Sequence, residues 1–580
     1  MLKYKVINEG ATQVWEAKEL VLRNRDITLE ESEIYLNPTD SIVEDDSMLY
    51  QNMDKAVKMF DKHISNKSKI GLLIDCDCDG YLSSSMMYDY IVNELNYKGE
   101  VVYFIHEGKI HGLSDDEVFS DILKANLDLL IIPDASSDEG LYHTRLNNDN
   151  VDIIVLDHHE AKLNNQANTD KTVIVNNQLS ILVNKNLSGT GVTYKFIKAH
   201  NELTTNKNTH YKYLDLVATS LISDVMDISG LDENRLLLHL GTSKENIQNK
   251  LIIKYFEKQT KDYLNFIDIA FDIASNINAI IRVGTYEDKE ILFKALCNSD
   301  EEVPYKSRKG MVNQTIQEAT MRIGTNKKAT QKRKQDKAVE NIEARIKDKN
   351  LLDNKVLIVN VSDVEMNGLG GMIASKLASQ YKRPIILVSQ LTDGSFGGSC
   401  RGYEACGIEN FKDKIDDTKL ANWTAGHQSA FGISINGNNL IELNNRFNEL
   451  FKDIKNETLY EVDKVYNNNL INTDIKAVAG LDRIWNGYIK EPLFAIEDVR
   501  ISTKDIQKIG NATYKFKYNG VSYVKNFGSK VWFEDFCCKS DNSFGYNNIK
   551  ITVVGKFRED KYGPYVDIED TYSELDEILF

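Results

Sequence analysis

The chain has 580 residues and is 42% hydrophobic. This length is too great for one hydrophobic core, since single cores stop growing at about 250–300 residues, and we expect roughly two to four domains. No apolar run is long enough to span a membrane, and the first residues do not resemble a secretory signal. The seven cysteines include no Cys-x-x-Cys pair, which argues against a disulfide framework or a zinc ribbon and is typical of a protein of the reducing cytoplasm. The net charge of -17 argues against nucleic-acid binding, but local charge matters more than the total, and bound cations offset clustered carboxylates.

The first part of the chain has the pattern of an α/β domain. Between the strands lie helical patterns, such as the one over residues 83–95. Short buried apolar runs that alternate with helices predict a parallel sheet, whose ligands bind at the carboxyl ends of the strands. The apolar runs that predict its strands are residues 70–74, 127–132, 151–156 and 172–175.

A helical, charged stretch follows over about residues 245–350. It holds the basic residues Lys327, Lys328, Lys332, Arg333 and Lys334, for which a solvated connecting helix is favoured over a nucleic-acid contact.

A second α/β unit is predicted after the charged stretch, with strands over 355–361 and 384–389, a helix over 368–380, and a Gly-rich segment over 394–402. From about residue 477 the chain is β-rich. Residues 513–518 alternate strictly between aromatic and polar side chains, and Asn519-Gly520 is a hairpin turn signal. Core packing is favoured for the aromatic face, and Lys515, Lys517 and Lys525, on or beside the hairpin, are expected to face solvent or nucleic acid.

The strongest local motif places Asp75, Asp77 and Asp79 at alternate positions, directly before Gly80. Three such carboxylates belong at a strand end or in a loop, where they can converge on cations. A calcium loop of the EF-hand type also begins in this way, but its twelfth position would be Met86 rather than Glu, and the residues before it resemble a strand.

A second motif, Asp157-His158-His159, follows another apolar run and offers ligands suited to Mn²⁺ or Zn²⁺; a polar strand cap is the alternative. Asp134 ends the run before it, and Asp224 lies in an apolar segment. A lone carboxylate among apolar residues is costly unless it is paired or binds a metal, although capping a helix is the usual role of either residue.

Together these motifs resemble the DHH phosphoesterase superfamily, whose pattern is DxDxDG, an isolated Asp, Asp-His-His and a further Asp. Further segments narrow the resemblance to the RecJ-type single-strand-specific exonucleases and extend it over nearly the whole chain. These segments are Asn186–Val192 (LSGxGV), Tyr213–Val217, Glu233-Asn234-Arg235 (ENR), Ile277–Arg282 (INAxxR), Gly397–Arg401 (GxGSxR) and Ala425–Gly432 (GGHxxAxG).

The resemblance implies a multidomain α/β fold with four parts. They are a parallel-sheet DHH domain (1–245), a helical connector (246–350), a smaller α/β DHH-associated domain (351–445), and a helix with a β-rich domain like an oligonucleotide-binding barrel (446–580).

The resemblance also implies hydrolysis by two Mn²⁺ or Mg²⁺ ions, with a bridging water attacking phosphorus. Asp77 and Asp79 would each bind one ion and Asp134 would bridge them. His158 and Asp224 would complete the second site. His159 would contact the scissile phosphate, and Asp157 would orient a ligand.

Candidate phosphate contacts are Ser399, Arg401 and the glycine amides beside them; a tight turn with a surface arginine is the alternative. Arg282 would contact the nucleic-acid strand, and His427 is either a substrate contact or a structural residue. The family's arginine for the 5′-phosphate has no clear match in this chain, and Lys109 is the nearest cation to its expected position. The chain departs from the family at Ala425, and at Leu73, where some members place a ligand histidine; Asp75 is the candidate substitute.

We therefore expect a nuclease that degrades single-stranded DNA 5′ to 3′ to mononucleotides in repair, recombination or replication. A single-strand-binding protein or a helicase is a candidate partner, no membrane is expected, and the compartment is the cytoplasm of a bacterial or phage-infected cell. The alternatives are a small-substrate DHH phosphodiesterase, acting on cyclic dinucleotides or nanoRNA, and a non-catalytic replication or repair scaffold.

Overall fold

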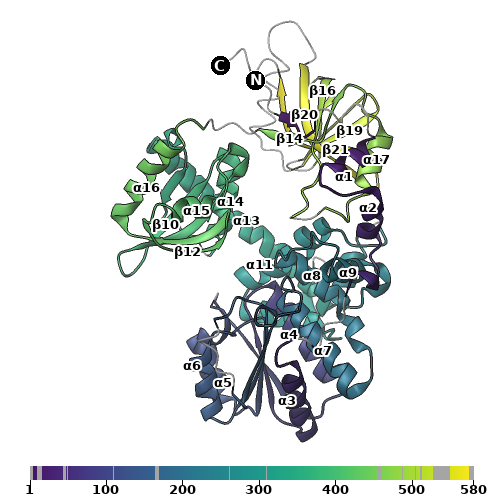
Figure 1. Cartoon of the computed structure of the whole chain (residues 1–580), viewed down its shortest axis with the longest axis vertical. Coiled ribbons are helices and arrows are strands. Elements are labelled where there is room, and N and C mark those ends of the chain that lie inside the picture. Colours follow the sequence, from purple (N-terminus) through teal and green to yellow (C-terminus); the bar gives the residue numbers. More distant parts are fainter. Residues whose placement is uncertain are drawn as a thin grey trace. The chain divides into compact units, whose positions relative to one another are not determined.

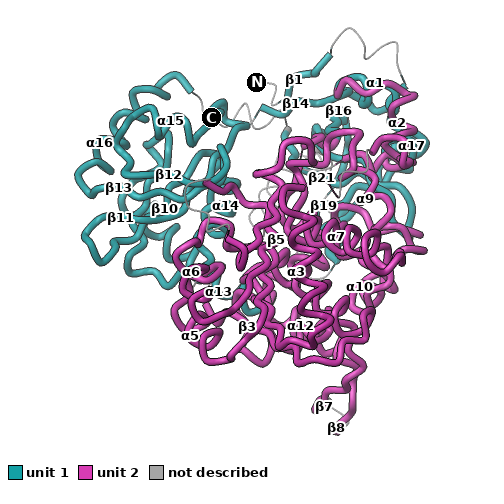
Figure 2. Tube along the Cα trace, turned by 60° about the horizontal axis from the view of Figure 1, so that its bottom comes forward, with its two compact units in different colours: residues 1–24, 329–478, 492–580 teal, residues 25–328, 479–491 magenta. Residues whose placement is uncertain are grey.

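The structure is a computed structural model that describes residues 4–8, 16–43, 48, 50–108, 110–162, 169–259, 261–307, 310–366, 368–454, 459–485, 488–502, 505–509, 513–526 and 549–573. The chain forms two compact units (Figure 2). One comprises residues 25–328 and 479–491, and because it holds the acidic motifs that the sequence predicts to be catalytic, we call it the catalytic unit; the other comprises residues 1–24, 329–478 and 492–580. Across the described ranges, no helix is both long and apolar enough to cross a membrane.

A five-stranded parallel sheet forms the centre of the catalytic unit (Figure 1). The four strands expected from the apolar runs are present, within two residues of their expected bounds, and a fifth lies at one edge. The sheet order is β3-β2-β4-β5-β6. The strands are β2 (Ile70–Ile74), β3 (Val101–Ile105), β4 (Leu129–Pro133), β5 (Asp152–Asp157) and β6 (Thr172–Asn176).

Helices cover both faces of this sheet, because successive strand residues point to opposite faces. Leu72 and Ile131 pack into one core with helices α3 (Met53–Asn66), α4 (Cys78–Asp89), α7 (Gly189–His200) and α8 (Leu214–Ser223). Leu73 and Leu130 pack into another with α5 (Asp116–Lys124) and α6 (Gly140–Asn148). Helix α4 begins five residues before the helix predicted from the sequence.

The expected connector is helical, with one exception. A β-hairpin interrupts it, formed by β7 (Glu302–Ser307) and β8 (Gly310–Thr315). Lys327 pairs with Asp288, and the Lys328 ammonium donates to the Phe271 carbonyl, so these two residues of the basic stretch are engaged within the protein. The helices of the connector are α10 (Lys250–Phe256), α11 (Ser275–Val283), α12 (Tyr286–Leu296) and α13 (Ile316–Asp348), and α9 (Glu233–Thr242) lies just before it.

A short later segment, residues 479–491, belongs to the catalytic unit although it lies far along the chain. Asp482 accepts hydrogen bonds from Lys261 and from Tyr263, the latter at 2.8 Å. The Arg483 guanidinium donates to the Thr242 hydroxyl at 2.8 Å, and the Tyr488 hydroxyl donates to the Val225 carbonyl at 3.0 Å. We call residues 479–491 the strap.

The second unit contains the expected smaller α/β sheet, in the order β12-β13-β11-β10-β9. The Gly-rich segment is not a turn: residues 396–401 form β11, paired with β10 and β13 on its two sides. The elements are β9 (Leu357–Asn360), α14 (Gly370–Tyr381), β10 (Ile385–Gln390), β11 (Phe396–Arg401), α15 (Phe411–Asp416), β12 (Ala421–His427), β13 (Ala430–Ile435) and α16 (Gly437–Leu450).

The expected β-rich tail is a seven-stranded sheet in the order β15-β16-β20-β21-β19-β18-β17. A hydrogen bond shows that this sheet curls. The Tyr518 hydroxyl on β18 donates to the Asp498 carbonyl on β16, although other strands separate β18 from β16 in the sheet order. Its strands are β15 (Lys464–Asn467), β16 (Phe494–Ile501), β17 (Gln507–Ile509), β18 (Thr513–Tyr518), β19 (Val521–Lys525), β20 (Ile549–Asp560) and β21 (Gly563–Ser573), with α17 (Asn472–Ala479) between the first two.

The hairpin predicted in the tail is confirmed. Tyr514 and Phe516 are buried, as the alternation predicts, while Lys517 is exposed. Lys525 does not face outward, because its ammonium donates to the carbonyls of Ile568 and Glu569.

The remaining elements precede the catalytic sheet or flank the tail. Strand β1 pairs in parallel with β14. These elements are β1 (Tyr4–Val6), α1 (Ala17–Arg23), α2 (Leu29–Leu36) and β14 (Tyr460–Val462).

Gly398 in β11 provides a test of the second sheet. A Cβ at this position would lie 1.9 Å from the backbone oxygen of Leu387, so Gly398→Ala must displace a strand and should cost about 1–3 kcal/mol of unfolding free energy. On the neighbouring strand, a Cβ at Gly432 would meet nothing closer than 3.4 Å, so Gly432→Ala is the matched control. Urea unfolding measures both; equal stability of the two variants would contradict the close approach.

Candidate metal centre

The acidic motifs meet at the carboxyl edge of the catalytic sheet. Asp75 follows β2, Asp134 follows β4, and Asp157 is the last residue of β5. Strand β2 lies between β3 and β4, so the chain leaves it in one direction for β3 and continues on its other side with β4. Such a switch in strand order opens a crevice in which ligands of open α/β sheets bind.

The DxDxDG motif turns from β2 directly into helix α4. Asp77 is the N-cap of α4, and its carboxylate accepts a hydrogen bond from the Gly80 amide at 3.0 Å. Gly80 has no room for a side chain, since a Cβ would lie 2.7 Å from the Asp75 carbonyl oxygen. This glycine therefore lets the helix begin immediately behind the first aspartate.

Asp79 is held by the start of a second helix, α7. The amides of Gly189 and Thr190 donate to its carboxylate at 2.7 and 2.8 Å, and the Ser220 hydroxyl donates at 2.5 Å. Free amides at a helix N-terminus stabilise a negative charge. The LSGTGV segment thus fixes the position of Asp79.

Asp134, His158 and Asp224 converge beside Asp79. His158 Nε2 lies 3.2 Å from Asp134 Oδ1 and 3.4 Å from Asp224 Oδ2. Both carboxylate oxygens of Asp134 and the Nε2 atom of His158 are buried without a hydrogen-bond partner. Buried polar atoms are rarely left unpaired. These atoms therefore fit a group of ligands for a cation.

Two sets of ligand atoms are close enough together to hold a cation each. One comprises Asp75, Asp77 and Asp134, and the other Asp79, His158 and Asp224; within each set the ligand atoms lie within 4.8 Å of one another. Asp134 also groups with His158 and His159, so it lies between the two sets. A cavity of about 330 Å³ borders the cluster and is lined by residues including Asp75, Asp134 and His159.

The electrostatics of the cluster also fit a cation. Burial, followed by repulsion from Asp79 and Asp77, raises the pKa of Asp134 well above its usual range. Burial and neighbouring aspartates raise the pKa of Asp77 to about 6 and that of Asp224 to about 8. Burial lowers the pKa of His158, which keeps its imidazole neutral. The neutral imidazole is the form that binds a metal, and a bound cation would relieve the repulsion that raises the pKa of these carboxyl groups.

Asp157 and His159 form a pair at the side of the cluster. Although burial alone would raise the pKa of Asp157, the hydrogen bond and charge of His159 lower it overall. His159 Nδ1 lies 2.8 Å from Asp157 Oδ1, and this hydrogen bond raises the pKa of His159 to about 9. The His159 side chain is half exposed, so it presents a cationic ring at the edge of the site.

His111 was not identified from the sequence, yet it contacts the first aspartate. Its Nδ1 lies 2.6 Å from Asp75 Oδ2, and the Gly112 amide donates to Asp75 Oδ1 at 3.0 Å. The sequence offers one signal, which is a histidine directly before a glycine in a loop that follows a strand. In the structure this glycine, Gly112, has φ 62°. Leu73 is buried in the core, so it is no ligand, while Asp75 lies in the cluster. Lys109 lies outside the described residues.

The ENR residues brace the loops of the site. The Asn234 amide donates to the carbonyls of Asn186 at 2.7 Å and Asp227 at 2.9 Å. Glu233 pairs with the buried Lys195. Arg235, which is also buried, donates to the carbonyls of Ile228 and of Arg483 in the strap.

The loop after Asp224 has a strained backbone. Val225 has φ 55°, which is unusual for a β-branched residue, and its carbonyl accepts the hydrogen bond from Tyr488 of the strap.

The other expected substrate contacts are far from the cluster residues in the sequence and lie on other helices and strands. Arg282 is exposed on α11 of the catalytic unit. Ser399, Arg401 and the exposed His427 belong to the second unit. Arg401 donates to the Ser375 hydroxyl at 3.0 Å and to the Cys400 carbonyl at 2.7 Å. Residues 397–401 are not the tight turn considered as the alternative, and because β11 is paired on both sides its glycine amides are engaged in the sheet rather than free for phosphate.

A larger cavity, of about 420 Å³, lies beside the edge strand β3 and does not include the cluster. Its lining is rich in unclustered surface acids, such as Glu107, Asp116 and Asp121, and offers no convergent ligand set among the described residues. The chemistry therefore points to the smaller cavity.

Known proteins resemble this chain in sequence and in fold. The family model described as "DHH family, N-terminal domain" matches residues 69–221. The chain is 35% identical over 575 residues to YorK of Bacillus subtilis (strain 168), named as a putative SPbeta prophage-derived single-strand DNA-specific exonuclease, with 97% of this chain and 96% of YorK covered. It is 26% identical over 457 residues to the single-stranded-DNA-specific exonuclease RecJ of the same organism, covering 77% of this chain and 53% of that protein.

The solved structure of RecJ from Thermus thermophilus in complex with Mn²⁺ has the same fold. It matches 97% of this chain and 77% of its own, with a TM-score of 0.67 and 17% identity. The chain therefore belongs to the DHH family, as a RecJ-like member.

Asn234→Ala tests the bracing of the site. The change removes the donor of two partly buried hydrogen bonds, which at about 0.5–1.5 kcal/mol each should cost about 1–3 kcal/mol of unfolding free energy. It should also weaken the binding of divalent cations, because the loops at 186 and 227 lose their common anchor. Urea unfolding and Mn²⁺ titration measure the two effects. Unchanged stability would show that the anchor is dispensable.

The raised carboxyl pKa values predict how the metal-free protein responds to pH. An acid whose pKa is higher in the folded state holds protons that the unfolded chain has lost, so stability falls as pH rises from about 4 to about 8. Asp134→Asn removes one charge from the cluster. The variant should melt higher than the parent in chelator at pH 8, and its melting temperature should depend less on pH.

The exposed Asp272 supplies the control for this experiment. Asp272→Asn removes the same charge from the surface and should reproduce the parental pH profile. If Asp134→Asn and Asp272→Asn melt alike at every pH, the repulsion within the cluster is not significant.

Proposed function

We propose that this chain is a divalent-metal-dependent exonuclease that hydrolyses single-stranded DNA. The observation that carries the proposal is the pair of adjacent ligand sets, with the unpartnered carboxylate of Asp134 between them. The names of YorK and RecJ, relatives that share this family, support the choice of substrate.

The residues present fit two Mn²⁺ or Mg²⁺ ions. Asp75, Asp77 and Asp134 would hold one, and Asp79, His158 and Asp224 the other. Bound there, the ions would neutralise phosphate charge and acidify an attacking water. Ligands that include imidazole favour Mn²⁺ over Mg²⁺, since Mg²⁺ prefers oxygen alone.

The chain's own groups position the substrate and the ligands. Asp157 keeps the His159 ring protonated and oriented, so His159 can donate a hydrogen bond to a non-bridging oxygen of the scissile phosphate. The α7 amides hold Asp79 against repulsion from its neighbours. Arg401, Ser399 and His427 would contact the terminal nucleotides, and Arg282 the backbone of the strand.

We further propose 5′ to 3′ degradation to mononucleotides in repair, recombination or replication. A single-strand-binding protein or a helicase is a candidate partner, because a strand must first be exposed. A small-substrate phosphodiesterase is disfavoured by the extent of the chain matched by YorK, and a scaffold by the intact ligand sets.

End-labelled single-stranded DNA tests the proposal directly. With Mn²⁺ the protein should release labelled mononucleotide first from the 5′-labelled strand, chelator should abolish release, and Mg²⁺ should support it less well. Asp134→Asn should reduce the rate by at least about 100-fold, since even changes behind the ligands of metal sites cost about 10–100-fold.

The surface variant Asp272→Asn again serves as the control and should cleave at the parental rate. Degradation that persists in excess chelator would contradict metal dependence. First release from the 3′-labelled strand would contradict the proposed polarity, and cleavage of cyclic dinucleotides alone would favour the small-substrate alternative.

A further inference from the structure

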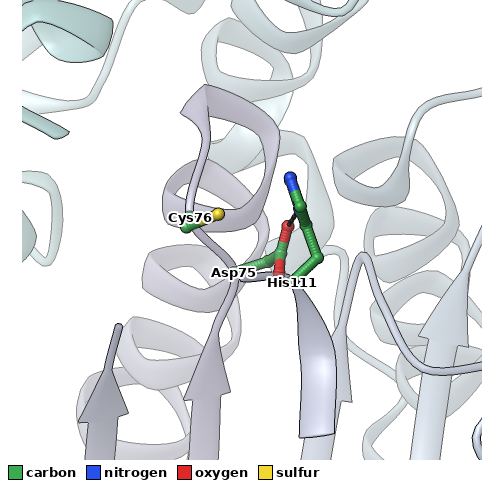
Figure 3. A group of neighbouring side chains, drawn as sticks. All are labelled: Asp75, Cys76 and His111. Carbon is green, nitrogen blue, oxygen red and sulfur yellow. Dashed lines mark hydrogen bonds and ion pairs between the residues drawn. The ribbon is translucent and has the colours of Figure 1, made fainter. Parts of the chain in front are cut away.

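One group of side chains at the edge of the site differs in chemistry from the two catalytic ligand sets. Asp75, Cys76 and His111 place a carboxylate, a thiol and an imidazole together (Figure 3), with ligand atoms within 4.8 Å of one another. Asp75 and Cys76 follow strand β2, and His111 comes from the loop after β3. The two catalytic sets contain only oxygen and nitrogen ligands.

The group is already ordered without a ligand. The contact of 2.6 Å between Asp75 and His111 fixes the imidazole, and the Gly112 amide fixes the other carboxylate oxygen. Cys76 is 8% exposed, whereas the His111 side chain is 58% exposed. The site is therefore preformed on its inner side and open on its outer side, where a water could complete a tetrahedron.

The ligand set favours zinc over the ions of the catalytic sets. Zn²⁺ binds Cys sulfur at about 2.3 Å and His nitrogen or carboxylate oxygen at about 2.0–2.2 Å, which places tetrahedral ligands roughly 3–4 Å apart. The present spacing needs only a small contraction to meet that requirement. Thiolate selects zinc and other soft ions, whereas Mn²⁺ and Mg²⁺ prefer oxygen.

We propose that Asp75, Cys76 and His111 form a third metal site that takes Zn²⁺, and that its occupation inhibits the nuclease. Binding displaces the proton shared by Asp75 and His111 and that of the Cys76 thiol, and both protons pass to solvent. The inhibitory half of this proposal rests on the proposed function; the binding half does not.

The coupling to catalysis arises because Asp75 belongs to two groups. It is also a member of the set with Asp77 and Asp134. A carboxylate drawn toward zinc between Cys76 and His111 is withdrawn from that set, which leaves it with two carboxylates. The same residue thus links a soft-metal site to the catalytic ions without any larger movement of the chain.

Cobalt absorption tests the binding half independently of activity. Co²⁺ replaces Zn²⁺ in thiolate sites, and a Co²⁺–thiolate bond gives a charge-transfer band in the near ultraviolet that oxygen and nitrogen ligands do not give. Co²⁺ in the two catalytic sets is therefore silent in this band. The metal-stripped protein should gain the band with Co²⁺ and lose it when Zn²⁺ is added.

Two cysteine variants complete this experiment. Cys76→Ser should lack the band, whereas Cys406→Ser, which changes a buried thiol in the second unit, should keep it. Circular dichroism and melting of each variant confirm that it is folded. No band in the parent protein, or a band that survives in folded Cys76→Ser, overturns the proposal.

The inhibitory half is tested on single-stranded DNA with saturating Mn²⁺. Added Zn²⁺ should inhibit the parent and Cys406→Ser alike, and Cys76→Ser should need at least tenfold more Zn²⁺ for the same inhibition. Equal sensitivity of Cys76→Ser and the parent overturns this half. If no variant cleaves DNA with any metal, the proposed function fails, while the cobalt band still decides whether the site exists.

Discussion

Mutual repulsion among buried carboxylates is the constraint on which the catalytic unit depends. Asp77, Asp79, Asp134 and Asp224 raise one another's free energy in a space largely closed to water. An unfolded chain would relieve this repulsion by letting the carboxylates move apart. Here hydrogen bonds from the first turns of α4 and α7 hold Asp77 and Asp79. Asp134 directly follows strand β4 and Asp224 ends helix α8, so only protons or cations can relieve the repulsion.

Much of this arrangement could be predicted from the sequence, because the relevant patterns are local. The apolar runs predicted the strands β2, β4, β5 and β6 to within two residues. The polar or acidic residues near the end of each run indicated the edge at which the site lies. The alternation over residues 513–518 predicted a buried aromatic face in the tail. Tyr514 and Phe516 are buried, whereas Tyr518 on the same face is half-buried.

What was missed depends on contacts between distant residues. His111 is meaningful only because the loop after β3 folds over Asp75. The tight turn considered as the alternative for residues 397–401 is instead part of a strand, since Gly398 allows the close approach of β10. Lys525 resembles a surface cation, yet its partners are carbonyls more than forty residues away. Spacing along the chain carries no information of this kind.

The strap has a consequence for how the protein is made. Chains fold from the N-terminus as they leave the ribosome, and domains usually fold as units. Residues 25–328 can assemble their sheet early, but Arg235 and the Val225 carbonyl acquire their strap partners only after residue 488 has been synthesised. The loop after Asp224 in the nascent catalytic unit therefore lacks its hydrogen bond from the strap until most of the polypeptide has emerged from the ribosome. A shortened chain that ends before the strap would stop permanently at that stage of maturation.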